Sequence, residues 1–469
     1  MTAQADYVIY HSRGGRAVIA AAVLGSGMTM LDGTVVNVAL RTIGADLGAS
    51  LSQLQWITNG YLLSLASLIL LGGALGDRFG RRRMFVIGTV WFAVASLVCG
   101  IAPNAEVLIA ARVLQGAGGA LLTPGSLAMI QGAFAPSERS TAIGAWTGLG
   151  AIAAAAGPLV GGLLIDYASW RLIFLMNIPL AVIAVIIAQR AVPESRDPES
   201  VPGFDLSGSA LAVLGLAGAT YALIEWGGPA AIIAAVVGVG ASATFIVVEQ
   251  RSRHPLMPLS MFGNRTFSAA NLMTLLVYAA LGAIFFFLVL QLQTVAGYTA
   301  LQAGLSTLPI TICMLFLAAR GGRLATRIGP RLPMTVGPMV MAVGVLWLLT
   351  VGPETVYWLH VLPGMAVFGL GLALMVAPLT ATVLAAAEDR HAGIASGVNN
   401  AISRTGSLLS VAALPVLVGL SGDDYAIPAS FDAGYERALI ICAVMLVVGG
   451  VISWLLIPAK LADCRPEAA

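Results

Sequence analysis

Apolar runs separated by short polar stretches recur along the whole chain. Fourteen of these runs are close to the ~20 residues that a helix needs to cross the hydrocarbon layer of a membrane. The predicted spans are 17–40, 56–75, 84–101, 106–131, 141–164, 172–189, 206–225, 229–250, 267–291, 302–319, 332–352, 357–383, 393–420 and 438–458. The pattern therefore predicts an all-α integral membrane protein with fourteen transmembrane helices.

The composition supports this class of protein and bears on whether ATP drives it directly. Hydrophobic residues make up 58% of the chain and charged residues only 10%, whereas a soluble globular domain carries about 25% charged residues. We therefore expect no sizeable soluble domain. Lys460 is the only lysine and lies in a polar tail, so the chain lacks the lysine of a phosphate-binding loop. This argues against direct pumping by ATP.

The lysine and arginine residues predict the orientation. If the N-terminus is cytoplasmic, the inside segments hold 19 of them and the outside segments hold three. A bias of this size fits the positive-inside rule only if the number of spans is even. We expect both termini in the cytoplasm. The run 17–40 is longer than the apolar region of a signal peptide and contains Asp32, so we interpret it as a retained first span.

Two similar loops divide the chain into repeats. The segment Gly73 to Arg83 follows the second span, and Gly322 to Arg331 follows the tenth. Both are expected to join the second and third helices of a six-helix set, which is the arrangement of parallel repeats. We predict an N-terminal bundle at 1–189, two intervening helices with cytoplasmic linkers at 190–266, and a C-terminal bundle with a tail at 267–469.

Several motifs, taken together and in this order, resemble a known family. The chain is similar to the fourteen-helix drug:proton antiporters of the major facilitator superfamily. The resemblance covers almost the whole chain and rests on Leu31 to Leu40, Gly73 to Arg83, Leu108 to Gly116, Gly157 to Gly162, and Trp170 to Pro179. It implies the major facilitator fold, with two six-helix bundles and two additional helices.

Three positions depart from the family pattern. Ala153 stands where a glycine usually opens the antiporter motif, and Arg41 stands where a proline is expected. In the thirteenth span, Ser403 and Arg404 replace an arginine–glutamine pair. The last departure affects the expected substrate path more than the fold.

The resemblance implies a proton-coupled antiporter that exports small amphipathic molecules, such as drugs or antibiotics, by alternating access. The expected partners are a small-molecule substrate, protons and the lipid bilayer; we expect no nucleic acid, no cofactor and a monomer in a bacterial inner membrane. A proton-coupled lipid exporter and a nutrient symporter of the same fold are the alternatives. The histidines His11, His254, His360 and His391 are scattered, which argues against an enzyme.

Asp32 and Arg112 are the candidate proton-coupling residues. Asp32 is the only acid deep in a span, and intramembrane carboxylates tend to mark proton or substrate pathways. From the rise per residue, Asp32 lies roughly 12 Å and Arg112 roughly 9 Å from the outer ends of their helices. At similar depth, Arg112 could pair with Asp32, and the family resemblance implies a proton-coupling role for both. The alternative is a fixed ion pair that holds the two spans together.

Arg404 and several polar residues are candidates for the substrate path. Arg404 lies about eleven residues into its span, near the midplane, with no acid in that span. It could pair with Asp32, attract an anionic group of a substrate, reach a water-filled cavity or make a purely structural contact. The polar candidates, for each of which helix–helix hydrogen bonding is the alternative, are Asn37, Tyr61, Gln115, Asn399 and Asn400. The outer segment 421–437 is predicted to be a polar loop.

Gating is assigned to two motifs. The carboxylate of Asp77 could cap the N-terminus of the thirteenth span when the inner mouth is shut. The resemblance implies this gating role for Asp77, Arg78 and Arg81, and Gly73 and Gly80 of the same motif are further gating candidates. The small residues and proline of the fifth span predict a hinge or seal between bundles, with ordinary helix packing as the alternative. These residues are Gly157, Pro158, Gly161 and Gly162.

Overall fold

The computed structural model describes residues 7–196, 205–252, 255–387 and 392–460, and their regular structure is helical. The α-helices are α1 (Arg13–Leu47), α2 (Leu51–Phe79), α3 (Arg81–Gly100), α4 (Ala105–Ala133), α5 (Pro136–Tyr167), α6 (Leu172–Leu175), α7 (Asn177–Ala191), α8 (Leu206–Ile224), α9 (Pro229–Arg251), α10 (Arg265–Thr294), α11 (Ala300–Leu305), α12 (Leu308–Ile328), α13 (Arg331–Trp347), α14 (Leu362–Ala385), α15 (Ala392–Leu417) and α16 (Pro428–Leu456). Short 3-10 or π segments are η1 (Leu259–Gly263), η2 (Leu348–Thr350), η3 (Tyr357–Val361) and η5 (Asp424–Ala426). The all-α fold class is confirmed.

The described helices account for the predicted membrane spans. Among the described residues, thirteen helical stretches are long and apolar enough to cross a membrane; α6 and α7 form one of them, and α11 and α12 form another. The predicted thirteenth span corresponds to α15, which has 26 residues but is more polar because it carries Asn399, Asn400 and Arg404. The chain is therefore a multi-pass membrane protein.

Several predicted boundaries need correction: α2 runs to Phe79 and α12 to Ile328, into the predicted loops. Helix α16 begins at Pro428, so the predicted polar loop 421–437 is largely helical. Its acidic residue Asp432 accepts a hydrogen bond from the side-chain amide of Gln291 in α10. The polar residues of this helix lie at its end, where a hydropathy pattern does not distinguish a helix from a loop. Helix α15 stops at Leu417 rather than at 420, and Gly419 follows it with a positive φ.

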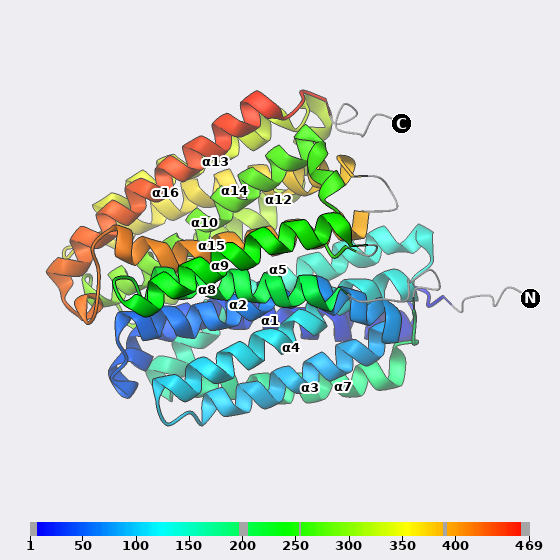
Figure 1. Cartoon of the computed structure of the whole chain (residues 1–469), viewed down its shortest axis with the longest axis horizontal. Helices are drawn as coiled ribbons and strands as arrows, with labels where there is room; N and C mark the ends of the chain where they lie inside the picture. Colours follow the sequence, from blue (N-terminus) through cyan, green and yellow to red (C-terminus); the bar gives the residue numbers. More distant parts are fainter. Residues whose placement is uncertain (1–6, 197–204, 253–254, 388–391, 461–469) are drawn as a thin grey trace, which may run out of the picture.

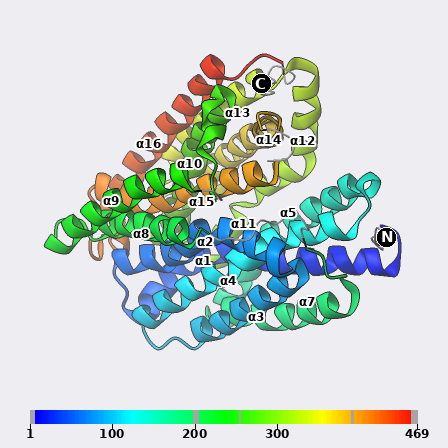
Figure 2. The ribbon, with the colours of Figure 1, turned by 45° about the vertical axis from the view of Figure 1, so that its right-hand side comes forward.

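The helices form two groups with a hairpin beside them (Figure 1). Helices α1 to α7 pack together as the first group, and α10 to α16 pack together as the second. Helices α8 and α9 pack against each other, and α8 contacts both α2 of the first group and α15 of the second. The described helix ends nearest the two chain termini lie on one side of the molecule, which we call the terminal side; the other is the distal side (Figures 1 and 2).

The two groups are joined at the distal side. The side-chain amide of Gln55 in α2 donates to the backbone carbonyl of Val411 in α15 at 2.7 Å. The amide of Gln293 in α10 donates to the carbonyl of Val38 in α1 at 2.8 Å. All hydrogen bonds that the described residues make between the two groups lie at the distal side. In Figure 1 the helices of the second group slant away from those of the first toward the terminal side.

The two repeated loops have the same backbone feature. Gly80 separates α2 from α3 with φ at 113°, and Gly329 follows α12 with φ at 83°, before α13. A glycine is needed at both turns because other residues rarely adopt positive φ. The domain boundaries at 189/190 and 266/267 stay predictions. Parts of the predicted linkers (197–204 and 253–254), the tail beyond residue 460, His254 and His391 lie outside the described residues.

Candidate functional site

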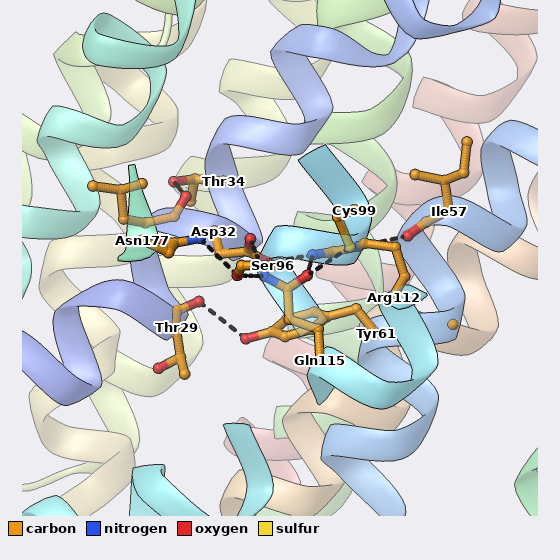
Figure 3. A network of polar contacts seen from close by, with 12 residues as sticks. Thr29, Asp32, Thr34, Ile57, Tyr61, Ser96, Cys99, Arg112, Gln115 and Asn177 are labelled. Atoms are coloured by element: carbon orange, nitrogen blue, oxygen red, sulfur yellow. Dashed lines mark hydrogen bonds and ion pairs between the residues drawn. The ribbon is translucent and has the colours of Figure 1, made fainter. Parts of the chain in front are cut away.

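A buried ion pair connects α1 to α4. Asp32 is fully buried and Arg112 is 1% exposed, and the Arg112 guanidinium donates through Nη1 to the Asp32 carboxylate oxygen Oδ2 (Figure 3). The structure therefore brings together the two residues that the sequence singled out at similar depth. A charge buried without a partner is far more costly than a buried pair, so the two residues hold each other in place.

Gln115 completes the partners of Asp32. It follows Arg112 by three residues on the same face of α4, and its Oε1 accepts from Arg112 Nη1 at 2.6 Å. Its Nε2 donates to Asp32 Oδ1 at 2.9 Å and to the hydroxyl of Ser96 in α3 at 2.7 Å. Both oxygens of Asp32 thus face N–H donors, which is the geometry of an ionised carboxylate. Gln115 is fully buried inside the first group, where its described contacts are within this network (Figure 3).

Arg112 is held by α2 as well. Its Nε donates to the backbone carbonyl of Ile57 at 3.0 Å, and its guanidinium carbon lies 4.3 Å from the centre of the Tyr61 ring. Tyr61 is 1% exposed and its hydroxyl donates to the carbonyl of Thr29 in α1 at 3.1 Å. The Tyr61 ring therefore forms a wall of the ion-pair site. Cation–π contact of this kind is strengthened by the absence of water.

Arg404 faces the first group from α15. Gly397 and Val411 lie seven residues before and after it, and both contact α2: an added Cβ at Gly397 would meet Leu70, and Val411 accepts from Gln55. Positions two helical turns apart share a face, so Arg404 lies on the face of α15 that is turned toward α2. Arg404 is half-buried.

One turn after Arg404, the hydroxyl of Ser407 donates to the backbone carbonyl of Tyr278 in α10 of the second group at 2.9 Å. Within the described part of the chain, the Arg404 side chain makes no hydrogen bond or ion pair. Of the alternatives weighed from the sequence, pairing with Asp32 is not made in this structure, because Asp32 is bound by Arg112 and Gln115.

The remaining substrate-path candidates fall into two sets. Asn399 points into the second group, where its Nδ2 donates to Asn271 Oδ1 at 3.0 Å and to Thr274 Oγ1 at 2.8 Å. It therefore takes the helix–helix alternative in this structure. Asn37 and Asn400 are half-buried, and their side chains make no hydrogen bond with the described residues. For these two amides the structure shows no helix–helix hydrogen bond among the described residues.

The residues predicted to form a loop at the terminal side are mostly helical: Gly73, Asp77 and Arg78 lie in the last two turns of α2, and Arg81 begins α3. Asp77 binds Arg81 one turn later, with 2.8 Å between Oδ1 and Nη2. The Arg78 guanidinium lies 5.6 Å from the centre of the Phe79 ring, and Gly73 lies near Pro124 of α4. Asp77 thus makes its ion pair within the first group, and the predicted contact with the N-terminus of α15 is not among the described ones.

A carboxylate after α7 supports this loop, although the sequence pattern did not indicate it. Glu194 Oε1 accepts from the backbone N–H of Arg82 at 3.1 Å, in the first turn of α3. The Arg82 guanidinium also donates to the carbonyl of Val192 at 3.0 Å. A Cβ at Gly80 would lie 2.7 Å from the Glu194 carboxylate, so glycine is needed there for space as well as for φ. An acid shortly after an arginine-rich loop is too common a pattern to predict this contact.

The four motif residues of α5 face two different neighbours. Gly157 and Gly161 lie against Thr34 and Val35 of α1, within the first group. Pro158 lies against Gly304, and Gly162 lies against the backbone of Leu301. Gly304 and Leu301 belong to α11 of the second group. A Cβ on Gly162 would lie 2.8 Å from the Leu301 nitrogen, a distance that real Cβ atoms do not adopt. The motif therefore packs the two groups together at the distal side.

Asp166 adds a polar contact to the same seam, and it too was not foreseen from the sequence. Its Oδ1 accepts from the N–H of Ala300 at 3.1 Å and its Oδ2 from the N–H of Leu301 at 2.9 Å. The last turn of α5 thus caps the first turn of α11, where backbone N–H groups lack partners within the helix. Its only sequence signal was an acid at the outer end of a span.

Asn59 in α2 is a further residue without a sequence signal. It is fully buried, and neither its Oδ1 nor its Nδ2 has a partner within the described structure. It lies one turn after Gln55, whose amide reaches α15. A buried amide without a hydrogen bond costs stability, so Asn59 is a candidate polar group of the interface between the two helix groups.

Two groups of membrane-spanning helices that meet at a seam on one side, with a buried ion pair inside the first group, define a class of membrane transporter. The comparison with known families agrees with this class. The model of the Major Facilitator Superfamily matches residues 22–411. The chain belongs to this superfamily.

Curated relatives cover nearly the same length. A puromycin resistance protein of Streptomyces alboniger is 36% identical over 97% of this chain and 92% of its own length. A methylenomycin A resistance protein of Bacillus subtilis is 34% identical over 95% of each chain. A tetracenomycin C resistance and export protein of Streptomyces glaucescens is 34% identical over 85% of this chain and 75% of its own.

Solved structures show the same fold at low sequence identity. A bacterial homologue of the human lysosomal transporter Spinster, in an inward-facing and unoccupied conformation, aligns with a TM-score of 0.69 at 17% identity, over 98% of this chain and all of that one. A D-xylose–proton symporter aligns with a TM-score of 0.69 at 16% identity, over 96% and 99%. These similarities concern the fold alone.

Proposed function

We propose that this protein is a proton-coupled antiporter that exports small amphipathic molecules across a bacterial cell membrane. The observation that carries the proposal is the buried network of Asp32, Arg112 and Gln115. Support for the cargo class comes from relatives named for resistance to, or export of, antibiotics, among them the puromycin and tetracenomycin C proteins. Both termini lie in the cytoplasm, so the terminal side is the inner side.

In this mechanism the structure corresponds to the inward-facing, deprotonated state. The distal seam is closed and Asp32 is surrounded by N–H donors. Cargo enters from the cytoplasm while Asp32 is ionised. After the groups rock and the distal side opens, a proton from outside binds Asp32, weakens its attraction to Arg112 and accompanies release of the cargo.

Arg112 keeps its place when Asp32 is protonated. Its bonds to Ile57 and Gln115 and its contact with Tyr61 do not require the Asp32 charge. The guanidinium is therefore retained near the carboxyl group and favours release of the proton once the inner side reopens. No cofactor takes part, because the proton gradient supplies the free energy.

Gating follows from contacts at the two ends. On the outer side, Pro158 and Gly162 pack against α11 and Asp166 caps it. On the inner side, Asp77 exchanges its contact with Arg81 for the N-terminus of α15 when the inner mouth closes. Gly73 and Arg78 flank Asp77 in α2, and Gly80 and Arg81 form the turn into α3 that holds Asp77 in its present position.

The test is export from everted membrane vesicles that contain the wild type, Asp32→Asn or Asp423→Asn. A panel of cationic, neutral and anionic antibacterial compounds is followed with and without an imposed pH gradient. We expect gradient-dependent export that is lost in Asp32→Asn and kept in Asp423→Asn, whose carboxylate is exposed in the distal loop. Full export by Asp32→Asn contradicts the role of Asp32, and uptake that runs in the same direction as protons indicates a symporter.

A further inference from the structure

The Arg404 side chain is a cation without a counter-charge among the described residues at the interface of the two helix groups. Its helix face is turned toward α2 of the first group. The Asp32 carboxylate has both oxygens occupied by Arg112 and Gln115. The ion pair is neutral as a unit, so Arg404 leaves this part of the described interior with a net positive charge.

Such a charge is tolerated only where water or an anion compensates it. While the inner side is open, water can hydrate the guanidinium of Arg404. When the groups close around the cargo that water is expelled, and an uncompensated guanidinium then opposes closure. A cargo with its own negative charge removes this cost, whereas a cationic cargo increases it.

The neutral groups near this interface suit the rest of such a ligand. Asn37 of α1 and Asn400 of α15 have side-chain amides that make no hydrogen bond within the described structure. Amide N–H groups and a guanidinium fork are the donors that recognise carboxylate, sulfonate and phenolate oxygens.

We propose that Arg404 binds the anionic group of the cargo, so that the exported class is amphipathic organic anions. This inference rests on the proposed export function and specifies its substrate. It has a consequence for energetics. An anion that leaves while protons enter moves net positive charge inward, so a membrane potential that is negative inside accelerates export at any proton stoichiometry.

Binding of three matched probes to the purified full-length protein tests the inference. The probes are naphthalene-2-sulfonate, the neutral naphthalene-2-sulfonamide and 2-naphthyltrimethylammonium. The sulfonate and the ammonium are permanently charged, so a pH gradient does not redistribute them passively. Equilibrium dialysis is carried out on the wild type, Arg404→Lys, Arg404→Gln and Arg41→Gln, in which an exposed arginine at the distal end of α1 is removed as the matched control.

The expected result is a selective loss of affinity for the anion. The wild type and Arg41→Gln bind the sulfonate roughly tenfold or more tightly than the other probes, as one charge-assisted hydrogen bond allows. Arg404→Gln loses that difference and keeps its affinity for the sulfonamide, while Arg404→Lys retains part of it. Unchanged sulfonate binding in Arg404→Gln, preference of the wild type for the ammonium, or failure of the wild type to bind the sulfonate overturns the inference.

Transport in proteoliposomes separates this inference from the proposed function. Radiolabelled probes are loaded on the side that corresponds to the cytoplasm, and export is driven by a pH gradient with or without a membrane potential. Sulfonate export that no gradient affects contradicts proton coupling but keeps the anion site. Gradient-driven export of the ammonium alone keeps proton coupling and overturns the anion site.

Discussion

Asp166 at the end of α5 and Leu301 in the first turn of α11 connect the two helix groups, with 2.9 Å between the Asp166 carboxylate and the Leu301 amide nitrogen. We expect Asp166→Ala to favour opening of the distal side, because loss of a helix cap costs about 0.5–2 kcal/mol. Spin labels at Ala45 in α1 and Ala429 in α16, both exposed, report the opening as longer distances in pulsed electron resonance. Asp166→Asn keeps an acceptor oxygen and is expected to change the distances less. Equal distances in all three proteins contradict a latch at this position.

Gly162 is expected to tolerate no side chain. A Cβ there would meet the backbone of Leu301, and overpacking of this kind costs about 1–3 kcal/mol. Gly162→Ala should therefore destabilise the closed distal seam and lower the export rate roughly tenfold. Gly148→Ala in the same helix is the control, since none of the described atoms lies within 4 Å of an added Cβ at Gly148. Similar export rates in the two variants would show that the glycine contact is ordinary packing.

Removal of Arg112 is expected to destabilise the protein more than removal of the Asp32 charge. Arg112→Gln leaves a buried carboxylate without its counter-ion, at a cost of about 3 kcal/mol or more. In Asp32→Asn, Arg112 keeps its hydrogen bonds to Ile57 and Gln115. Thermal unfolding of the purified single variants and of the double variant gives the coupling between the two residues. Strictly additive effects on Tm would mean that the pair has no net interaction.

Asp77→Ala is expected to abolish export while leaving substrate binding unchanged. In the present conformation Asp77 contacts Arg81 of its own group, so its loss does not disturb the interface between groups. The missing contact is needed only when the inner mouth shuts. Binding and export are measured on the same preparation, with the exposed Asp423→Ala as control. Normal export by Asp77→Ala would exclude a gating role.

Asp205 and Glu249 are expected to hold a proton between them at the base of the α8–α9 hairpin. Asp205 is 7% and Glu249 3% exposed, and neither Asp205 Oδ2 nor Glu249 Oε1 has a hydrogen-bond partner among the described residues. The two oxygens lie near each other, because a Cβ added at Gly208 would be within 3 Å of both. Adjacent buried carboxylates repel unless one is neutral. Glu249→Gln supplies an N–H donor and should keep or raise Tm, whereas Glu249→Ala should lower it. A large drop in Tm for Glu249→Gln contradicts a shared proton.

The fold was largely predictable because the membrane restricts the choices. In hydrocarbon every backbone polar group needs an internal partner, so each long apolar run must form a helix. The pattern therefore predicted the helices, including the polar α15. Helix ends were predicted less well, as at Pro428, because polar residues beyond the hydrocarbon are equally compatible with a loop and a helix.

The candidate site was predictable only in part. Asp32 and Arg112 stand out because charges at that depth are rare, and helical rise placed them at the same level. Tyr61 and Gln115 were assigned to the cavity, but the structure places them in the buried network around Arg112. Asn399 likewise turns to Asn271 rather than to the interface of the groups. Their direction depends on the rotation of each helix about its axis.

The sequence by itself determined the class, the number and order of the helices and the two charges of the ion pair, since hydrophobicity and charge act along the chain. The tertiary structure decided which side chains face one another: Gln115 with Asp32, Gly162 with Leu301, and Arg404 with neither acid nor hydrogen-bond partner among the described residues. Apolar surface around a membrane helix gives little information on its rotation, because lipid and a neighbouring helix are nearly equally apolar. Packing of small residues and a few hydrogen bonds settle it.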